Sequence, residues 1–154
     1  MNIFALDRDP AKAAQYLCDK HVVKMCLETA QILSTISGGP YKPTHANHPC
    51  TLWAKETLGN YRWLLQHGRA IGFEYYHRYG KEHKSTEVIL SCGDFRPNDI
   101  ETMTPFALAM PEEFRKSDPI ESYRDYYMSK QSFCNWTNRD IPEWFLERLD
   151  VSCS

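Results

Sequence analysis

The first quarter of the chain contains a helical segment, residues 10–36, that is apolar over most of its circumference. Asp9 followed by Pro10 is typical of an N-cap and a first helical residue, and the run Ser37-Gly38-Gly39-Pro40 ends the segment. Projected at about 100° per residue, the apolar side chains fill two adjoining arcs and leave one narrow polar stripe. We therefore predict a helix that is buried on most sides, at the centre of a helical bundle.

The polar stripe admits two interpretations, a functional site or simply the solvated side of the helix. Its members are Lys20, His21, Lys24, Glu28, Gln31 and Thr35. Because His21, Lys24 and Glu28 are spaced i, i+3 and i+7, they lie on one side of the helix within two turns. A carboxylate between apolar walls has a raised pKa, and a nearby lysine lowers that pKa again, which is how sites tune a general acid or base.

The remaining segments also predict helices joined by loops. Residues 2–6 are apolar and form either a strand or an extended arm. A second long helix is expected from Pro49 to Gly80, weakened by its internal glycines Gly59, Gly68 and Gly72. A shorter helix is expected over residues 85–92, with Ser85 as its N-cap.

The C-terminal third begins with an ordered, mostly irregular loop over residues 93–118, which is rich in proline. Asp118-Pro119 repeats the N-cap and proline pattern and predicts a helix over residues 119–131, and a short helix is expected from Pro142. The fold class expected is all-α, with residues 1–154 forming a compact single-domain helical bundle around a buried N-terminal helix, with long ordered loops.

Composition excludes several classes of protein. The six cysteines form no CxxC pair, and His45 and His48 have no carboxylate nearby, so we expect neither a metal nor a cofactor. The N-terminus does not have the pattern of a signal peptide and there is no apolar run of about 20 residues, so a cytoplasmic protein that does not bind membranes is expected. The net charge of −2 lacks the basic excess typical of proteins that bind duplex DNA, which leaves a local basic patch as the alternative.

Short motifs in the chain resemble the phage pyrimidine-dimer DNA glycosylase family, also called endonuclease V. Asp19, His21 and Glu28 have the spacing of the Asp-x-His and catalytic glutamate on the first helix of that family. Further similarities, over most of residues 15–130, are His48 before the second helix, Pro111-Glu112-Glu113-Phe114-Arg115, and Tyr126-Tyr127 with Lys130. The chain also resembles small phage proteins with Asp-Lys-His and Asn-His-Pro signatures, which places it in the host cytoplasm if it is phage-encoded.

The resemblance implies a metal-free DNA N-glycosylase and lyase that acts on a modified or damaged pyrimidine. The family nucleophile is the N-terminal α-amine, carried here by Met1, which attacks the sugar C1′, displaces the base and forms an imine. Glu28 takes the role of the catalytic glutamate, with His21 and Lys24 as its neighbours in the cleft. An α-amine suits this chemistry because its reference pKa is about 8. Leu27 and Thr29 flank Glu28 where the family carries phosphate-binding arginines.

Candidate substrate contacts lie in several parts of the chain. They are Asp19, Gln31, Asn47, His48, Arg62, Lys81, His83, Tyr126, Tyr127 and Lys130. Aromatic residues interleaved with bases, as around Lys81 and Lys130, favour stacking combined with phosphate contact, although an aromatic core with solvated lysines produces the same pattern. Asn47-His48-Pro49 is either the mouth of the site or a helix start.

Three functions remain open at this point. The first is the DNA glycosylase, with DNA as its partner. The second is the same scaffold binding or processing a free nucleotide or a nucleotide-derived signal, which suits an acidic chain better. The third is a non-catalytic phage binding module.

Overall fold

The computed structural model describes residues 1–153 and confirms the all-α prediction, since this part of the chain contains helices and no strand. The α-helices are α1 (Pro10–Tyr16), α2 (Asp19–Ser37), α3 (Pro49–Glu56), α4 (Leu58–Tyr79), α5 (Thr86–Ser91), α6 (Pro119–Met128) and α7 (Glu143–Cys153). Two 3-10 turns, η1 (Glu112–Phe114) and η2 (Gln131–Phe133), lie on either side of α6 in the sequence.

The first predicted helix is in fact two helices, α1 and α2, so the expectation of one continuous helix over residues 10–36 was wrong. Leu17 and Cys18 between them have extended backbones, and both residues are fully buried. Tertiary hydrogen bonds replace helical ones at this break. The Cys18 N–H donates to the hydroxyl of Tyr127 at 2.9 Å, and the Asp19 N–H donates to the carbonyl of Asn135 at 2.7 Å.

The second predicted helix is also divided, at Thr57 rather than at a glycine. Thr57 is extended and caps α4 by accepting a hydrogen bond from the Asn60 N–H at 2.9 Å. Gly59 instead lets a distant loop approach the helix. A Cβ at this position would lie 2.4 Å from the carbonyl oxygen of Glu101. Gly59 is therefore required because a larger residue would clash with this loop, and the packing outweighs the low helix propensity of glycine.

Local sequence signals located most helix starts correctly. Asp9 and Asp118 accept hydrogen bonds from Ala11 N and Ile120 N, so both act as the predicted N-caps. Ser85 occupies the predicted cap position of α5, but its hydroxyl pairs with that of Tyr41 at 2.9 Å instead of capping the helix. The helix expected over residues 119–131 ends at Met128, and η2 follows it.

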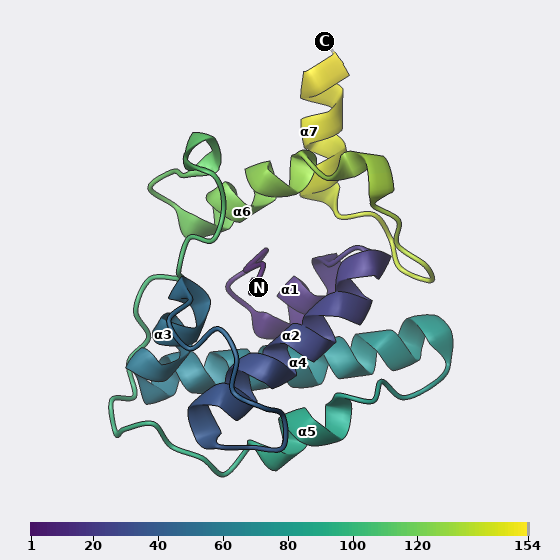
Figure 1. The fold of residues 1–154 in the computed structure, drawn as a ribbon. Coiled ribbons are helices and arrows are strands. Elements are labelled where there is room, and N and C mark those ends of the chain that lie inside the picture. Colours follow the sequence, from purple (N-terminus) through teal and green to yellow (C-terminus); the bar gives the residue numbers. More distant parts are fainter. Residues whose placement is uncertain (154) are drawn as a thin grey trace.

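The helices form two groups with the N-terminal arm, residues 1–6, between them (Figure 1). On one side, α1, α2 and α3 pack against the long α4, and α5 packs against α2 and α4. On the other side lie α6 and α7. Residues 2–6 are buried between the groups as an extended arm and join the hydrophobic core. Of the two structures expected for residues 2–6, a strand or an extended arm, the extended arm is the one observed.

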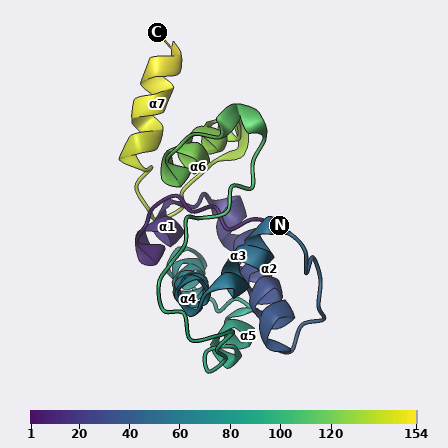
Figure 2. The same ribbon diagram turned by 90° about the vertical axis from the view of Figure 1, so that its left-hand side faces the viewer.

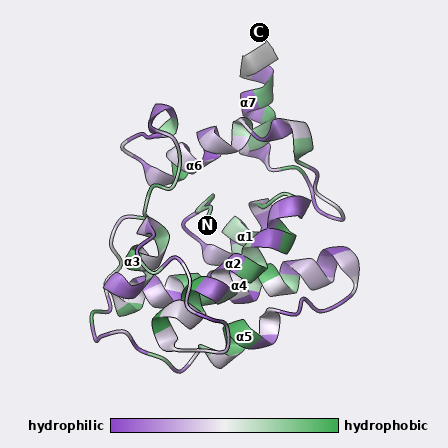
Figure 3. Cartoon of the chain, in the orientation of Figure 1, coloured by the Kyte–Doolittle hydropathy of each residue, from purple (hydrophilic) through white to green (hydrophobic). Residues whose placement is uncertain are grey.

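Helix α2 packs against α3, α4 and α5, yet part of its surface faces solvent. Figure 2 shows α2 and the loop that follows it on the right of the molecule and α1 on the left. Val23 and Leu27, expected to be buried, are 44% and 40% exposed. Figure 3 shows hydrophobic and hydrophilic residues along the helices. Among residues 1–153, no helix has the length and apolar character needed to cross a membrane.

Candidate active site

The α-amine of Met1 and the carboxylate of Glu28 form an ion pair, with 3.0 Å between the nitrogen and Oε1. Glu28 is buried on α2, and its Oε2 has no hydrogen-bond partner among the described residues. The Met1 side chain is 1% exposed although the residue as a whole is only half-buried, so its accessible surface belongs to the main chain, which carries the amine. A primary amine and a buried carboxylate are therefore in direct contact at the N-terminal arm.

Hydrogen bonds of Asn2 fix the arm that carries this amine. The Asn2 Oδ1 accepts from the N–H groups of Ile3 and Phe4 at 2.7 and 2.9 Å, and its Nδ2 donates to the carbonyl of Ala109 at 2.7 Å. The Met1 sulfur accepts a weak hydrogen bond from Thr51 on α3 at 3.8 Å. The arm is therefore tied to the loop before α6 and to α3, which fixes where the amine lies.

Phe4, two residues further along the arm, adopts a φ of 39°, a left-handed conformation that bulky residues rarely adopt. Its ring stacks on the imidazole of His21, with 4.3 Å between centroids. Strain of this kind persists only where surrounding contacts impose it. The imidazole of His21 thus forms the surface against which the arm packs.

The position of His21 is set in turn by a buried hydrogen-bond network. Its Nδ1 lies 2.7 Å from the hydroxyl of the fully buried Tyr127, which also lies 3.4 Å from the Cys18 sulfur. The hydrogen bond with Cys134 lowers the pKa of the Cys18 thiol against the opposing effect of burial, and His21 adds to this shift. Seven residues separate His21 from Glu28, or about 10 Å along a helix. His21 thus lies two turns before Glu28 on α2, and its catalytic role stays a prediction.

His48 lies beside the amine–carboxylate pair, at the start of α3. Its Nδ1 accepts a hydrogen bond from the Cys50 N–H at 3.0 Å, so the residue is an N-cap, as one of the two interpretations held. The pKa of His48 is lowered by burial, and then by the positive charges of the Met1 amine and His45. His48 is therefore neutral at neutral pH, and its proton lies on Nε2. The neighbouring Asn47 is exposed.

Two predicted substrate contacts have structural partners instead. Asp19 accepts hydrogen bonds from Arg78 at 3.0 Å and from the main chain and hydroxyl of Thr137 at 2.9 and 2.6 Å. Tyr127 is fully buried and bonded to His21. Both residues join distant parts of the chain; Tyr127 is fully buried, whereas the Asp19 side chain remains 20% exposed.

The other predicted site residues lie on the surface around α2 or beyond it. Lys24 is exposed on α2, and Gln31 is half-buried one turn after Glu28. The Lys130 ammonium lies 4.4 Å from the ring of Tyr126 and 5.9 Å from that of Phe4, which brings it to the arm. Arg62 is exposed on α4.

A pocket of about 260 Å³ lies at the turn between α4 and α5. Its lining residues are Tyr75, Lys81, Glu82, His83 and Lys84. His83 donates a hydrogen bond from Nε2 to the carbonyl oxygen of Val23 on α2 at 3.0 Å. The predicted contacts Lys81 and His83 are therefore placed together against α2.

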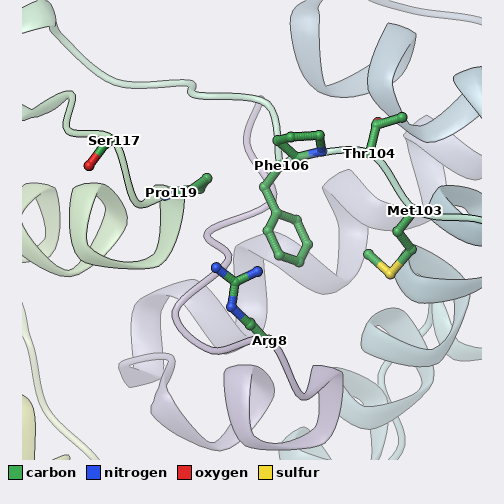
Figure 4. Close-up of a pocket in the computed structure, with 7 residues that line it drawn as sticks. Arg8, Met103, Thr104, Phe106, Ser117 and Pro119 are labelled. Atoms are coloured by element: carbon green, nitrogen blue, oxygen red, sulfur yellow. The ribbon is translucent and has the colours of Figure 1, made fainter.

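A second hollow, of about 520 Å³, contains none of the predicted site residues (Figure 4). It is lined by Arg8, Met103, Thr104, Pro105, Phe106, Ser117 and Pro119. Within residues 1–153, no three histidine, cysteine, aspartate or glutamate side chains meet as a metal site would require.

The fold and the ion pair between Met1 and Glu28 define an all-helical protein whose N-terminal amine contacts a buried carboxylate. The family model for pyrimidine dimer DNA glycosylase matches residues 1–87, which include the arm, helices α1–α4 and the start of α5. The chain belongs to the pyrimidine dimer DNA glycosylase family, and this confirms the resemblance read from its motifs. Searches of curated proteins and of solved structures returned no match.

Sequence reasoning missed Asn2 and Phe4, the residues that hold the amine in place. The only signal available was the short apolar run that follows Asn2, which did not distinguish a strand from an arm. The hydrogen bonds of Asn2 involve its own neighbours and a residue 107 positions away, and no local pattern reveals the second of these.

Proposed function

We propose that this DNA glycosylase uses the Met1 amine as its nucleophile and Glu28 as its proton acceptor, and that it also cleaves the strand at the resulting abasic site. The observation that carries the proposal is the 3.0 Å contact between the two groups. An ammonium group has no lone pair and must lose a proton before it attacks, and the carboxylate is within reach of that proton.

The reaction then follows from the chemistry of a primary amine. The nitrogen lone pair forms a bond to the sugar C1′, and the glycosidic C1′–N bond breaks with its electron pair leaving on the base. The nitrogen then loses one of its two protons, and its lone pair opens the C1′–O4′ bond while O4′ takes up a proton, which gives a protonated imine. Loss of a proton from C2′ expels the phosphate at C3′, and water hydrolyses the imine to release the enzyme.

The two oxygens of the buried Glu28 carboxylate suit both parts of this reaction, the attack by the amine and the later proton transfers at the sugar. Oε1 holds the amine, whereas Oε2 has no hydrogen-bond partner among the described residues. A buried acceptor without a partner is costly in a folded protein and points to a group that acts on substrate. We propose that Oε2 moves protons at the sugar. A damaged or modified pyrimidine is the proposed base, in keeping with the family.

Borohydride trapping of the imine tests this proposal. The enzyme is incubated with duplex DNA containing an abasic site, reduced, and analysed for a covalent adduct whose peptide is identified by mass spectrometry. We expect an adduct on the α-amine of Met1. A variant with one additional N-terminal residue is the control, because its amine is displaced from Glu28. An adduct on a lysine, or equal trapping by the extended variant, would overturn the proposal.

A further inference from the structure

Basic side chains fall into two groups according to whether they form ion pairs. Among residues 1–153, seven of the nine arginines are in ion pairs: Arg8, Arg78, Arg96, Arg115, Arg124, Arg139 and Arg148. Of the nine lysines in the same part of the chain, only Lys116 is in one. The arginines therefore tie the fold together, while the remaining lysines keep their charge available.

Most of these unpaired lysines surround the exposed side of α2. The solvent-facing strip of that helix carries Lys20, Val23, Lys24 and Leu27. At one end, Lys42 lines a hollow of about 430 Å³ together with Leu27 and Gln31. We call this strip and the lysines beside it the α2 face.

Further lysines lie on both flanks of the strip. On one flank, His83 binds the Val23 carbonyl and brings the pocket with Lys81 and Lys84 against α2. On the other flank, Lys130 lies over Phe4 of the arm that carries the amine. The α2 face is thus bordered by the α4–α5 turn on one side and by the active site on the other.

Acidic groups offset little of this charge. Glu28 is paired with the Met1 amine and Asp19 with Arg78, so both carboxylates are already neutralised. Glu82 lies in the same pocket as Lys81 and Lys84 and opposes them. The α2 face therefore has a local excess of positive charge although the whole chain carries −2.

We infer that the α2 face binds the phosphate backbone of duplex DNA, with the α4–α5 turn as a contact region distinct from the active site. Its lysines are Lys20, Lys24, Lys42, Lys81, Lys84 and Lys130. The inference rests on the proposed function, since the bound strand must pass the Met1 amine. Lysines bind phosphate as point charges and need no fixed geometry, so flexible unpaired side chains suit this role.

Salt dependence of binding supplies the test, because each phosphate contact releases counterions. Affinity for a duplex with a non-cleavable tetrahydrofuran abasic site is measured by fluorescence anisotropy over a range of salt concentrations. The test variant is K81A/K84A, which lies away from Glu28. The matched control is K12A/K55A, whose exposed, unpaired lysines lie on α1 and at the end of α3 away from His48.

We expect K81A/K84A to bind more weakly and to lower the slope of log K against log salt by about 1 to 2. K12A/K55A should match the wild type, and thermal unfolding should be unchanged in both variants. An unchanged slope in K81A/K84A, or an equal loss in K12A/K55A, would overturn the inference while wild-type imine trapping still supported the proposed function. Failure of the wild type both to bind and to trap would overturn both.

Discussion

The α-amine of Met1 lies 3.0 Å from Oε1 of Glu28, a contact between the first residue of the chain and the middle of a buried helix. It depends on the arm between them, which Asn2 ties to Ala109 and Phe4 ties to His21. The proposed chemistry therefore depends on the residues that position the arm as well as on the two reacting groups.

Replacing Glu28 by glutamine should reduce turnover by a factor of about 10² to 10⁴, because the amide cannot accept the proton of the amine. Binding to the tetrahydrofuran duplex should persist, since the side chain keeps its size. Single-turnover assays and anisotropy measure the two effects separately. E56Q, which removes an exposed negative charge at the end of α3, is the control. Full activity in E28Q would show that the carboxylate has no catalytic role.

Replacing Tyr127 by phenylalanine should lower the free energy of unfolding by about 1 to 3 kcal/mol, because buried polar groups on Cys18 and His21 lose their partner. Chemical denaturation measures this change. Y126F is the matched control, since its half-buried hydroxyl makes no hydrogen bond within the described residues. Equal stabilities of the two variants would contradict the network described for His21.

Replacing Glu74 by glutamine should cost about 3 to 5 kcal/mol of stability, because Arg139 loses its ion pair and the buried Arg78 keeps only Asp19 as a charged partner. Burial alone would raise the pKa of Glu74, but hydrogen bonds from Arg139 and Arg78 outweigh burial and lower it. The stabilisation is therefore present above the ordinary pKa of 4.5 and lost as pH falls through the lower folded-state value. E87Q on the surface of α5 should change stability by less than about 0.5 kcal/mol.

His67 should make the protein less stable in mild acid. Burial lowers the pKa of this fully enclosed side chain from 6.5 to about 4, so between these values the unfolded chain binds a proton that the folded protein does not. The free energy of unfolding should keep its full value above pH 6.5 and be about 2 kcal/mol lower at pH 5. Urea unfolding at pH 7 and pH 5 checks this, with H67Q as the comparison. An identical loss in H67Q would assign the effect to other groups.

Much of the fold was predictable because its signals are local. Asp9-Pro10 and Asp118-Pro119 cap helices through hydrogen bonds that span two residues, and any chain with these pairs favours a helix start there. The spacing of His21 and Glu28 placed both on one side of a helix, and the short motifs were sufficient to predict the family that the comparison confirmed.

Tertiary structure decided the features that depend on distant partners. Cys18 leaves the helix because Tyr127, 109 residues away, accepts its N–H, and Gly59 is needed because the loop at Glu101 packs against it. The sequence alone determined that Glu28 lies in a polar stripe on a largely buried helix. Only the packing of the arm determined that the Met1 amine meets it, because that contact arises from long-range hydrogen bonds and ring stacking, which have no local periodicity to reveal them.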